Sequence, residues 1–297
     1  MVASLTFFGG GNMATAVMGG LAGAAEGQRA IPVQVVDPVD SVRARWERDF
    51  HATAHAHPNA AACSSDCWVL AVKPQDMHTL CAQLHRHGPG HSALVLSVAA
   101  GVRISTLVRW LGQQHRIVRS MPNTPALIGM GISALYAPPE VGSADRDAAQ
   151  ALLGGVGDTL WLGAEGQIDA VTAVSGSGPA YVFRFMEALQ DAAHALGLAP
   201  EQARQLVIAT LCGAGALAQS SPLQPAQLRE QVTSKGGTTA AALAVMEQED
   251  FAGLMRRALQ AAASRSVELS QLSDTATSNT ATSDTATSNT ATSSTSP

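Results

Sequence analysis

The chain has 297 residues, a formal net charge of −5 at pH 7 and 4% aromatic residues. This length suffices for two domains, and the lack of any Lys or Arg block argues against binding to nucleic acid or to an anionic membrane surface. The cysteines and histidines match no metal-ligand spacing and no apolar run is long enough to span a membrane, so we expect a metal-free, cytoplasmic protein.

Short apolar runs alternate with helical patterns in the first half of the chain. The predicted strands cover 4–8, 33–36, 68–72, 93–98, 116–120, 132–136 and 159–162. The predicted helices begin near 12, 38, 59 and 74, or cover 104–111 and 143–153. Continuous Val, Leu and Ile strands between helices are typical of a parallel sheet that is covered on both faces. We therefore predict an α/β domain over residues 1–163.

Helical periodicity continues almost without interruption after residue 163, and no convincing strand follows. The predicted helices cover 180–196, 200–219, 225–232, 238–248 and 251–272. The apolar spacing over 206–217 indicates a helix that is buried on most sides, in a bundle or against another subunit. We therefore predict an all-α domain over residues 164–272.

A five-residue repeat of small and polar residues fills the end of the chain. From residue 274 it alternates Asp-Thr-Ala-Thr-Ser with Asn-Thr-Ala-Thr-Ser and contains no large apolar side chain. Such a segment cannot bury enough apolar surface to offset the entropy lost on ordering. The repeat therefore predicts a disordered tail over residues 273–297.

Three consecutive glycines separate the first predicted strand from the first predicted helix. Gly9, Gly11 and Ala14 fit the G-x-G-x-x-A pattern of a dinucleotide-binding turn. Glycines let the backbone turn tightly and approach the pyrophosphate, whose charge is stabilised by the helix N-terminus. A tight turn without a ligand is the alternative, but the position between a strand and a helix favours a dinucleotide.

Asp37 ends the second predicted strand, where two roles are open. An acid there can bind the ribose hydroxyls of NAD and repel the 2′-phosphate of NADP. Arg43 and Arg45 follow closely and could compensate for that repulsion. Alternatively, Asp37 caps a helix that begins at Pro38.

Small or rigid residues follow three further strands at the expected carboxyl edge of the sheet. Lys73 could contact ribose or phosphate, or Lys73-Pro74 could be an ordinary strand-to-helix junction. The small residues at 97–101 would let a nicotinamide lie against the backbone, or would simply pack a buried strand. The Pro-Asn-Thr-Pro loop at 122–125 could shape a pocket or serve as a structural turn.

The segment over 233–239 reads Thr-Ser-Lys-Gly-Gly-Thr-Thr. The bare N–H groups of Gly236 and Gly237, with hydroxyls from Thr238 and Thr239, form an anion pocket sized for a carboxylate. Ser234 can cap the helix that follows, and a helix cap without a ligand is the alternative reading.

Five motifs occur together in the order and spacing found in pyrroline-5-carboxylate reductases. They lie at 8–14, 71–74, 119–126, 175–181 and 236–239. The chain resembles that family over about residues 1–270. The resemblance implies a Rossmann-type domain, a helical domain that forms homodimers, and dimers that can assemble into decamers. It also implies reduction of 1-pyrroline-5-carboxylate to proline with NADPH or, in some members, NADH.

The same resemblance implies roles for individual residues. The pyrophosphate would lie on Gly9, Gly10, Gly11, Asn12 and Met13. The rest of the cofactor would contact Asn59, Ala71, Val72, Lys73, Pro74, Ala99 and Ala100. The substrate would lie on Ser234, Gly236, Gly237, Thr238 and Thr239. Of these, Thr239 would act in catalysis by pointing its hydroxyl at the ring nitrogen of the substrate.

The chain departs from the family pattern at three places. Lys235 replaces the common proline, an acid and a histidine are missing at 222–224, and Asp37 argues for NADH instead of NADPH. A rival activity is that of another imine or 3-hydroxyacid reductase. The 3-hydroxyacid enzymes typically use as acid a lysine on a helix of the second domain, whereas Lys235, the only lysine after Lys73, lies in a glycine loop at a helix start, which argues against them. A non-catalytic nucleotide sensor is a further alternative, although it would not need the Gly-Gly-Thr-Thr loop.

Overall fold

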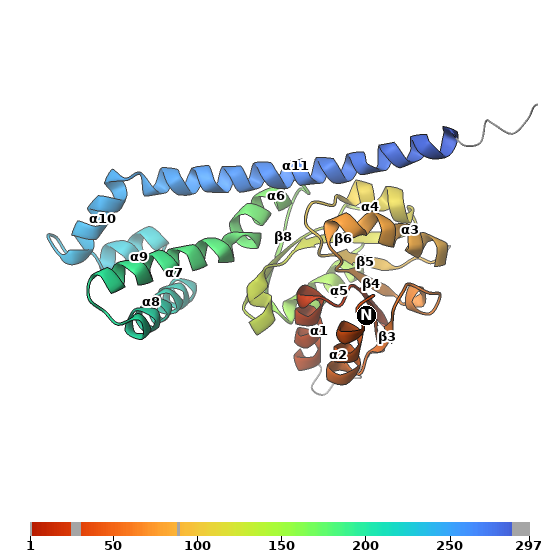
Figure 1. Ribbon diagram of the computed structural model, residues 1–297, viewed down its shortest axis with the longest axis horizontal. Helices are drawn as coiled ribbons and strands as arrows, with labels where there is room; N and C mark the ends of the chain where they lie inside the picture. Colours follow the sequence, from red (N-terminus) through yellow and green to blue (C-terminus); the bar gives the residue numbers. More distant parts are fainter. Residues whose placement is uncertain (1, 25–30, 88–89, 287–297) are drawn as a thin grey trace, which may run out of the picture. The chain divides into compact units, whose positions relative to one another are not determined.

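The computed structural model describes residues 2–24, 31–87 and 90–286 (Figure 1). The chain divides into two units. Unit 1 contains Met1–Gly176 together with Ala262–Pro297, and unit 2 contains Ser177–Ala261. The predicted domain boundary at residue 163 therefore falls inside unit 1. Ile168 and Ala173, which follow that boundary, are buried in unit 1.

Unit 1 is built around an eight-stranded sheet in the order β3-β2-β1-β4-β5-β6-β7-β8. Strand β7 runs antiparallel to β6, and the remaining neighbours pair in parallel. The strands are β1 Leu5–Phe8, β2 Val33–Val36, β3 Thr53–His55, β4 Cys67–Leu70, β5 Leu94–Ser97, β6 Arg116–Met121, β7 Gly131–Tyr136 and β8 Gly157–Trp161. This order places β1 and β4 side by side as the third and fourth strands, where the chain switches from one part of the sheet to the other.

Helices cover both faces of the sheet (Figure 1). They are α1 Asn12–Ala24, α2 Asp40–Phe50, α3 Met77–His87, α4 Ile104–Leu111, α5 Ser143–Gly154 and α6 Gln167–Val171. On β1, Phe7 belongs to one core cluster and its neighbour Phe8 to the other. Because successive side chains of a strand point to opposite faces, this sheet needs continuous apolar strands, as its sequence shows.

Short turns replace two of the predicted helix starts. The helix expected near residue 59 is only the 3₁₀ turn Ala62–Ser64, because the backbone becomes extended at Ser65 and enters β4 at Cys67. The Asn59 side chain accepts the Ala62 N–H at 2.9 Å. The helix expected at Pro74 begins with the 3₁₀ turn Pro74–Asp76 before α3. Another 3₁₀ turn, Thr124–Ile128, follows β6, and the π-helical turn Thr172–Gly176 follows α6.

Unit 2 is helical throughout its described length. Its helices are α7 Gly178–Ala195, α8 Pro200–Ser220, α9 Pro225–Gln231, α10 Thr238–Gln248 and the first part of α11, which spans Phe251–Ala286. Within the single chain α8 is largely exposed, since Leu206 and Leu217 are 54% and 55% exposed, so burial against another subunit is the alternative that stays a prediction. Among the described residues, no single helix has the length and apolar character of a membrane span, although α8 and α9 pass such a test as a pair bent by 119°.

Helix α11 continues into the segment that the repeat predicts to be disordered. It ends at Ala286, and residues 287–297 of the predicted tail lie outside the described part of the chain. The first residue of the repeat, Asp274, forms ion pairs with Arg103 and Arg109 of unit 1. These charged partners lie far away in the sequence, so composition alone does not reveal them.

Candidate active site

The glycine turn lies at the carboxyl end of β1, an interior strand between β2 and β4. The Gly9 N–H donates to the Val36 carbonyl at 2.8 Å, and its φ of +96° suits glycine. A Cβ at Gly9 would lie 2.8 Å from the Ala71 carbonyl oxygen, so a side chain does not fit. At Gly11 no atom lies within 4 Å of the corresponding position, and the residue is exposed. The turn thus leaves open space at the start of α1.

Side chains from α2 hold the middle of this turn. The Gly10 carbonyl accepts hydrogen bonds from Arg45 Nη2 at 2.8 Å and from Trp46 Nε1 at 3.0 Å. A Cβ at Gly10 would lie 2.6 Å from Cγ1 of Val42, so α2 packs directly on the glycine. Arg45, which the sequence suggested could compensate for the repulsion of a 2′-phosphate, therefore uses part of its guanidinium to support the turn itself.

Asp37 joins the glycine turn to the beginning of α2. Its Oδ2 accepts the Gly10 N–H and its Oδ1 accepts the Val39 N–H, both at 2.9 Å. Helix α2 begins at Asp40 with Val39 as its N-cap residue, so the predicted capping of a helix at Pro38 is wrong. The Asp37 side chain instead shapes the turn, and each carboxylate oxygen keeps a second lone pair that a ribose hydroxyl can use.

The predicted cofactor residues of β4 and β5 lie beside the glycine turn. Ala71 N–H donates to the Phe8 carbonyl at 2.8 Å, and Val98 N–H donates to the Leu70 carbonyl at 3.1 Å. Ala71 and Ala99 thus follow neighbouring strands at one edge of the sheet. Ala71, Val72 and Ala100 are half-buried, Ala99 is buried, and Lys73 and Pro74 are exposed. Asn12 is exposed and Met13 half-buried at the start of α1.

Asn59 is held in a polar network between β2 and β3. Its Nδ2 lies 3.0 Å from His55 Nδ1, and His55 Nε2 lies 2.8 Å from Gln34 Oε1. Its Oδ1 accepts the Ala62 N–H, as described above. Both ends of the amide therefore have protein partners, and a contact with the cofactor would use its remaining N–H or lone pair.

Strand β6 and the loop that follows it use their polar residues for support. The buried Arg119 donates from Nη1 to Glu165 Oε1 at 2.9 Å, and the same oxygen accepts the Ile104 N–H at 2.8 Å. Asn123 Oδ1 accepts the Ile132 N–H at 2.9 Å. These bonds favour the structural interpretation of the Pro-Asn-Thr-Pro loop over a ligand contact by Asn123.

The Gly-Gly-Thr-Thr loop forms the beginning of α10 in unit 2. Gly237, and not Ser234, is the N-cap residue of α10, and no side chain caps it. Ser234 instead closes the turn, because its carbonyl accepts the Gly237 N–H at 3.0 Å. Gly236 has a φ of +73°, and Thr239 is half-buried while Thr238 and Lys235 are exposed. The first N–H groups of α10 are therefore open to an anion.

The buried cysteines have no nucleophilic role at this site. Burial raises the pKa of Cys63 to about 11 and that of Cys67 and Cys81 to about 12. At neutral pH these groups are therefore thiols, whereas the reactive form is the thiolate. Within the described ranges, no three His, Cys, Asp or Glu side chains come close enough together to hold a metal ion.

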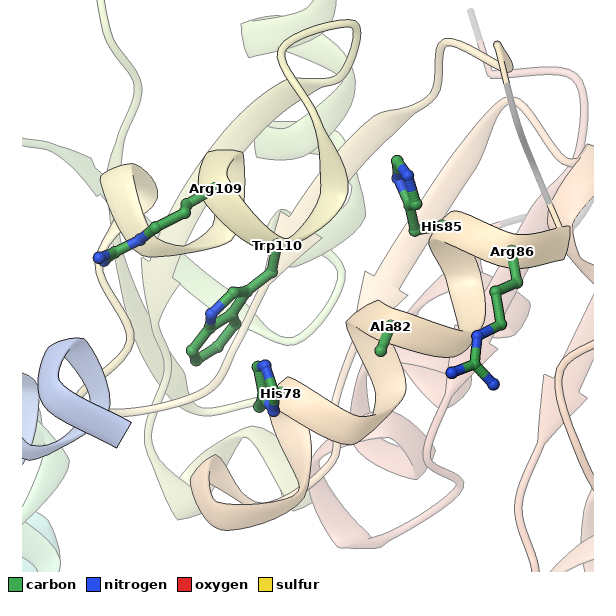
Figure 2. A pocket seen from close by; sticks show the side chains of 6 residues that line it. All are labelled: His78, Ala82, His85, Arg86, Arg109 and Trp110. Carbon is green, nitrogen blue, oxygen red and sulfur yellow. The ribbon is translucent and has the colours of Figure 1, made fainter. Parts of the chain in front are cut away.

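A basic cavity of about 360 Å³ lies between α3 and α4 (Figure 2). Its walls carry His78, Ala82, His85, Arg86, Arg109 and Trp110. The His78 and Trp110 rings are in contact, with centroids 5.1 Å apart. The α3 residues that line the cavity have helical spacing and therefore lie on one face of that helix. This spacing is visible in the sequence, but it was not among the predicted site features. None of the predicted cofactor residues lines this cavity.

The sheet order and the glycine turn are those of a Rossmann-type dinucleotide-binding protein, here with a helical second unit. A family model described as NADP oxidoreductase, coenzyme F420-dependent, matches residues 4–101. A model for pyrroline-5-carboxylate reductase dimerisation matches residues 165–269. The predicted fold class is thereby confirmed.

Relatives with the predicted activity match nearly the whole chain. Pyrroline-5-carboxylate reductase of Pseudomonas aeruginosa is 44% identical over 269 residues, which cover 90% of this chain and 97% of the relative. The solved pyrroline-5-carboxylate reductase of Coxiella burnetii has a TM-score of 0.84 and 37% identity, covering 91% and 99% of the two chains. The Plasmodium falciparum enzyme, solved with NADP bound, has a TM-score of 0.78 and 28% identity, covering 90% and 98%. The chain belongs to the pyrroline-5-carboxylate reductase family, as its five motifs predict.

Proposed function

We propose that the protein reduces 1-pyrroline-5-carboxylate to L-proline with a nicotinamide cofactor, the final step of proline biosynthesis. The observation that carries this proposal is the 44% identity to a pyrroline-5-carboxylate reductase across both units. The glycine turn fits the cofactor, because Gly11 leaves open space beside the first N–H groups of α1 and Gly9 permits the close turn. The residues Gly9 to Met13 would hold the pyrophosphate, and Ala71 to Pro74, Ala99 and Ala100 would line the remainder.

The chemistry makes modest demands on the side chains. The bound dihydronicotinamide supplies the hydride that the imine carbon receives. A protonated cyclic imine is already electrophilic, so the protein needs no strong general acid. The protein binds the substrate carboxylate through the backbone N–H groups that begin α10, near Gly236 to Thr238. The Thr239 hydroxyl faces the ring nitrogen, which orients the imine.

Steady-state turnover tests the proposal directly. We expect purified protein to oxidise NADH or NADPH when 1-pyrroline-5-carboxylate is added, and to release proline in equal amount. Absorbance of the reduced nicotinamide and chromatography of the product measure the two sides of the reaction. No turnover with either cofactor would refute the proposed activity, and a 3-hydroxyacid substrate serves as the control for the rival reaction.

The choice between NADH and NADPH depends on Asp37. The NADP bound to the Plasmodium falciparum relative and the family resemblance support NADPH. The Asp37 carboxylate, 8% exposed beside the glycine turn, would repel a 2′-phosphate and so supports NADH.

We expect Asp37→Ser to shift the ratio of kcat/KM for NADPH over NADH upward by about tenfold, because one negative charge near the ribose disappears. Parallel kinetics with both cofactors measure this ratio. Asp49→Ser removes an acid at the far end of α2, whose partner is Arg48, and should leave the ratio unchanged. An unaltered ratio in Asp37→Ser would mean that Asp37 does not select the cofactor and only forms its structural hydrogen bonds with Gly10 and Val39.

A homodimer, in some assemblies extended to a decamer, is part of this proposal. Apolar side chains on unit 2 support it, since Phe183 and Val245 are each 58% exposed and Val232 is 64% exposed. Such surfaces are usually covered by another subunit.

A cytoplasmic location is proposed as well, supported by the free thiols of Cys63, Cys67, Cys81 and Cys212.

A further inference from the structure

The loop that follows β5 packs against the middle of α11, within unit 1. A Cβ at Gly101 would lie 3.3 Å from Cβ of Leu269, and Ser270 is fully buried. Gly101 directly follows Ala99 and Ala100, the residues predicted to line the nicotinamide. The position of this loop therefore depends on how α11 is held against unit 1.

One acid of α11, Asp274, makes charged contacts at α4. Asp274 Oδ1 accepts a hydrogen bond from the buried Thr106 hydroxyl and lies 3.6 Å from Arg109 Nη2. Its Oδ2 lies 3.7 Å from Nη1 of Arg103. The Asp274 side chain is 28% exposed, so solvent screens these pairs only in part.

Arg103 connects these contacts to the cofactor loop. It is the N-cap residue of α4 and comes two positions after Gly101. Arg109 donates to the Thr106 hydroxyl at 3.2 Å and also lines the basic cavity of Figure 2, so Asp274 neutralises charge on a strongly basic helix face. One carboxylate thus fixes both ends of α4 relative to α11.

We propose that Asp274 is a positioning residue for cofactor binding. It acts through Arg103 and α4 on the loop of Ala99 and Ala100, and it does not touch the cofactor. This inference rests on the proposed function to the extent that it uses the predicted contact of that loop with the nicotinamide. A segment that composition alone assigns to a disordered tail thereby contributes to the dinucleotide site.

Asp274→Ala should weaken cofactor binding and leave the chemical step intact. We expect the Kd for the reduced cofactor and its KM to rise about threefold to fivefold, because two partly exposed ion pairs and a hydrogen bond are lost. The kcat and the KM for the imine should stay near the wild-type values. Quenching of protein fluorescence by the reduced cofactor, without substrate, measures the Kd, and steady-state kinetics separate KM from kcat.

Two further variants make the result specific. Asp274→Glu keeps the charge and should restore most of the cofactor affinity. Glu268→Ala removes an equal charge from the same helix, where its partner is Arg265 one turn away, and should bind cofactor like the wild type. A wild-type Kd in Asp274→Ala, or an equal loss in Glu268→Ala, would overturn the proposal. Because binding is measured without the imine, wild-type protein that binds cofactor but reduces no imine would refute the proposed function alone.

Discussion

Gly9→Ala is expected to abolish measurable cofactor binding and to lower the stability of unit 1. The new Cβ would lie 2.8 Å from the Ala71 carbonyl oxygen, and a φ of +96° is unfavourable for alanine. The backbone atoms of Ala71 and Val72 that it would meet cannot move aside cheaply, so we expect a loss of about 2–4 kcal/mol in the free energy of unfolding. Calorimetry measures the stability, and cofactor titration followed by fluorescence measures the affinity.

Substitutions at two other glycines of the same region distinguish an effect on folding from an effect on cofactor binding. Gly11→Ala meets no atom within 4 Å, so the variant should fold normally yet bind cofactor weakly, because the methyl group occupies the space left for the pyrophosphate. Gly19→Ala, also without close neighbours, lies within α1 and should be neutral or slightly stabilising. If Gly9→Ala kept both wild-type stability and wild-type affinity, the role assigned to the turn would be wrong.

Thr239→Ala is expected to reduce kcat/KM for 1-pyrroline-5-carboxylate by about tenfold to a hundredfold. The reason is that a hydrogen bond to a charged or polar ring nitrogen contributes about 1.5–3 kcal/mol. Cofactor affinity should not change, because Thr239 belongs to the substrate loop. Thr239→Ser keeps the hydroxyl and should recover most of the activity. The measurement is steady-state kinetics with the imine varied at saturating cofactor.

A neighbouring threonine provides the matched control for this experiment. Thr233 belongs to the same loop, but its hydroxyl donates to the Arg229 carbonyl at 2.6 Å and so completes the end of α9. Thr233→Ala should therefore lose a little stability and keep its kcat/KM. Equal kcat/KM values for Thr239→Ala and the wild type would show that Thr239 has no role in catalysis.

Periodicity predicts the elements of this protein well because most of them bury a regular apolar face. The glycine turn after β1 was recognisable since its glycines follow a strand and precede a helix. By contrast, β3 is a strand of three residues, Thr53–His55, too short and polar to give a signal. The helical pattern after residue 163 predicts helices correctly, but periodicity does not reveal that Ile168 packs in unit 1.

Contacts between distant residues account for most of what the sequence left open. The bonds of Asp37 to Gly10 and Val39 depend on how β2 lies next to the glycine turn, which a linear pattern does not contain. Ser234 has the chemistry of a helix cap, yet the turn at Gly236 places Gly237 at that position instead. The sites could be predicted only as motifs. The order of the motifs along the chain matches the family, but the sequence does not contain the spatial arrangement of their residues.

The two separate stretches of chain that build unit 1 have a consequence for synthesis on the ribosome. Thr106 and Asp274 are 168 positions apart, and Asp169 receives its bond from Ser266 across 97 positions. Contacts of such long range form late, since the intervening chain must first be made and its loop closed. The sheet can therefore assemble as the first half emerges, but the dinucleotide-binding unit is completed only when α11 has left the ribosome.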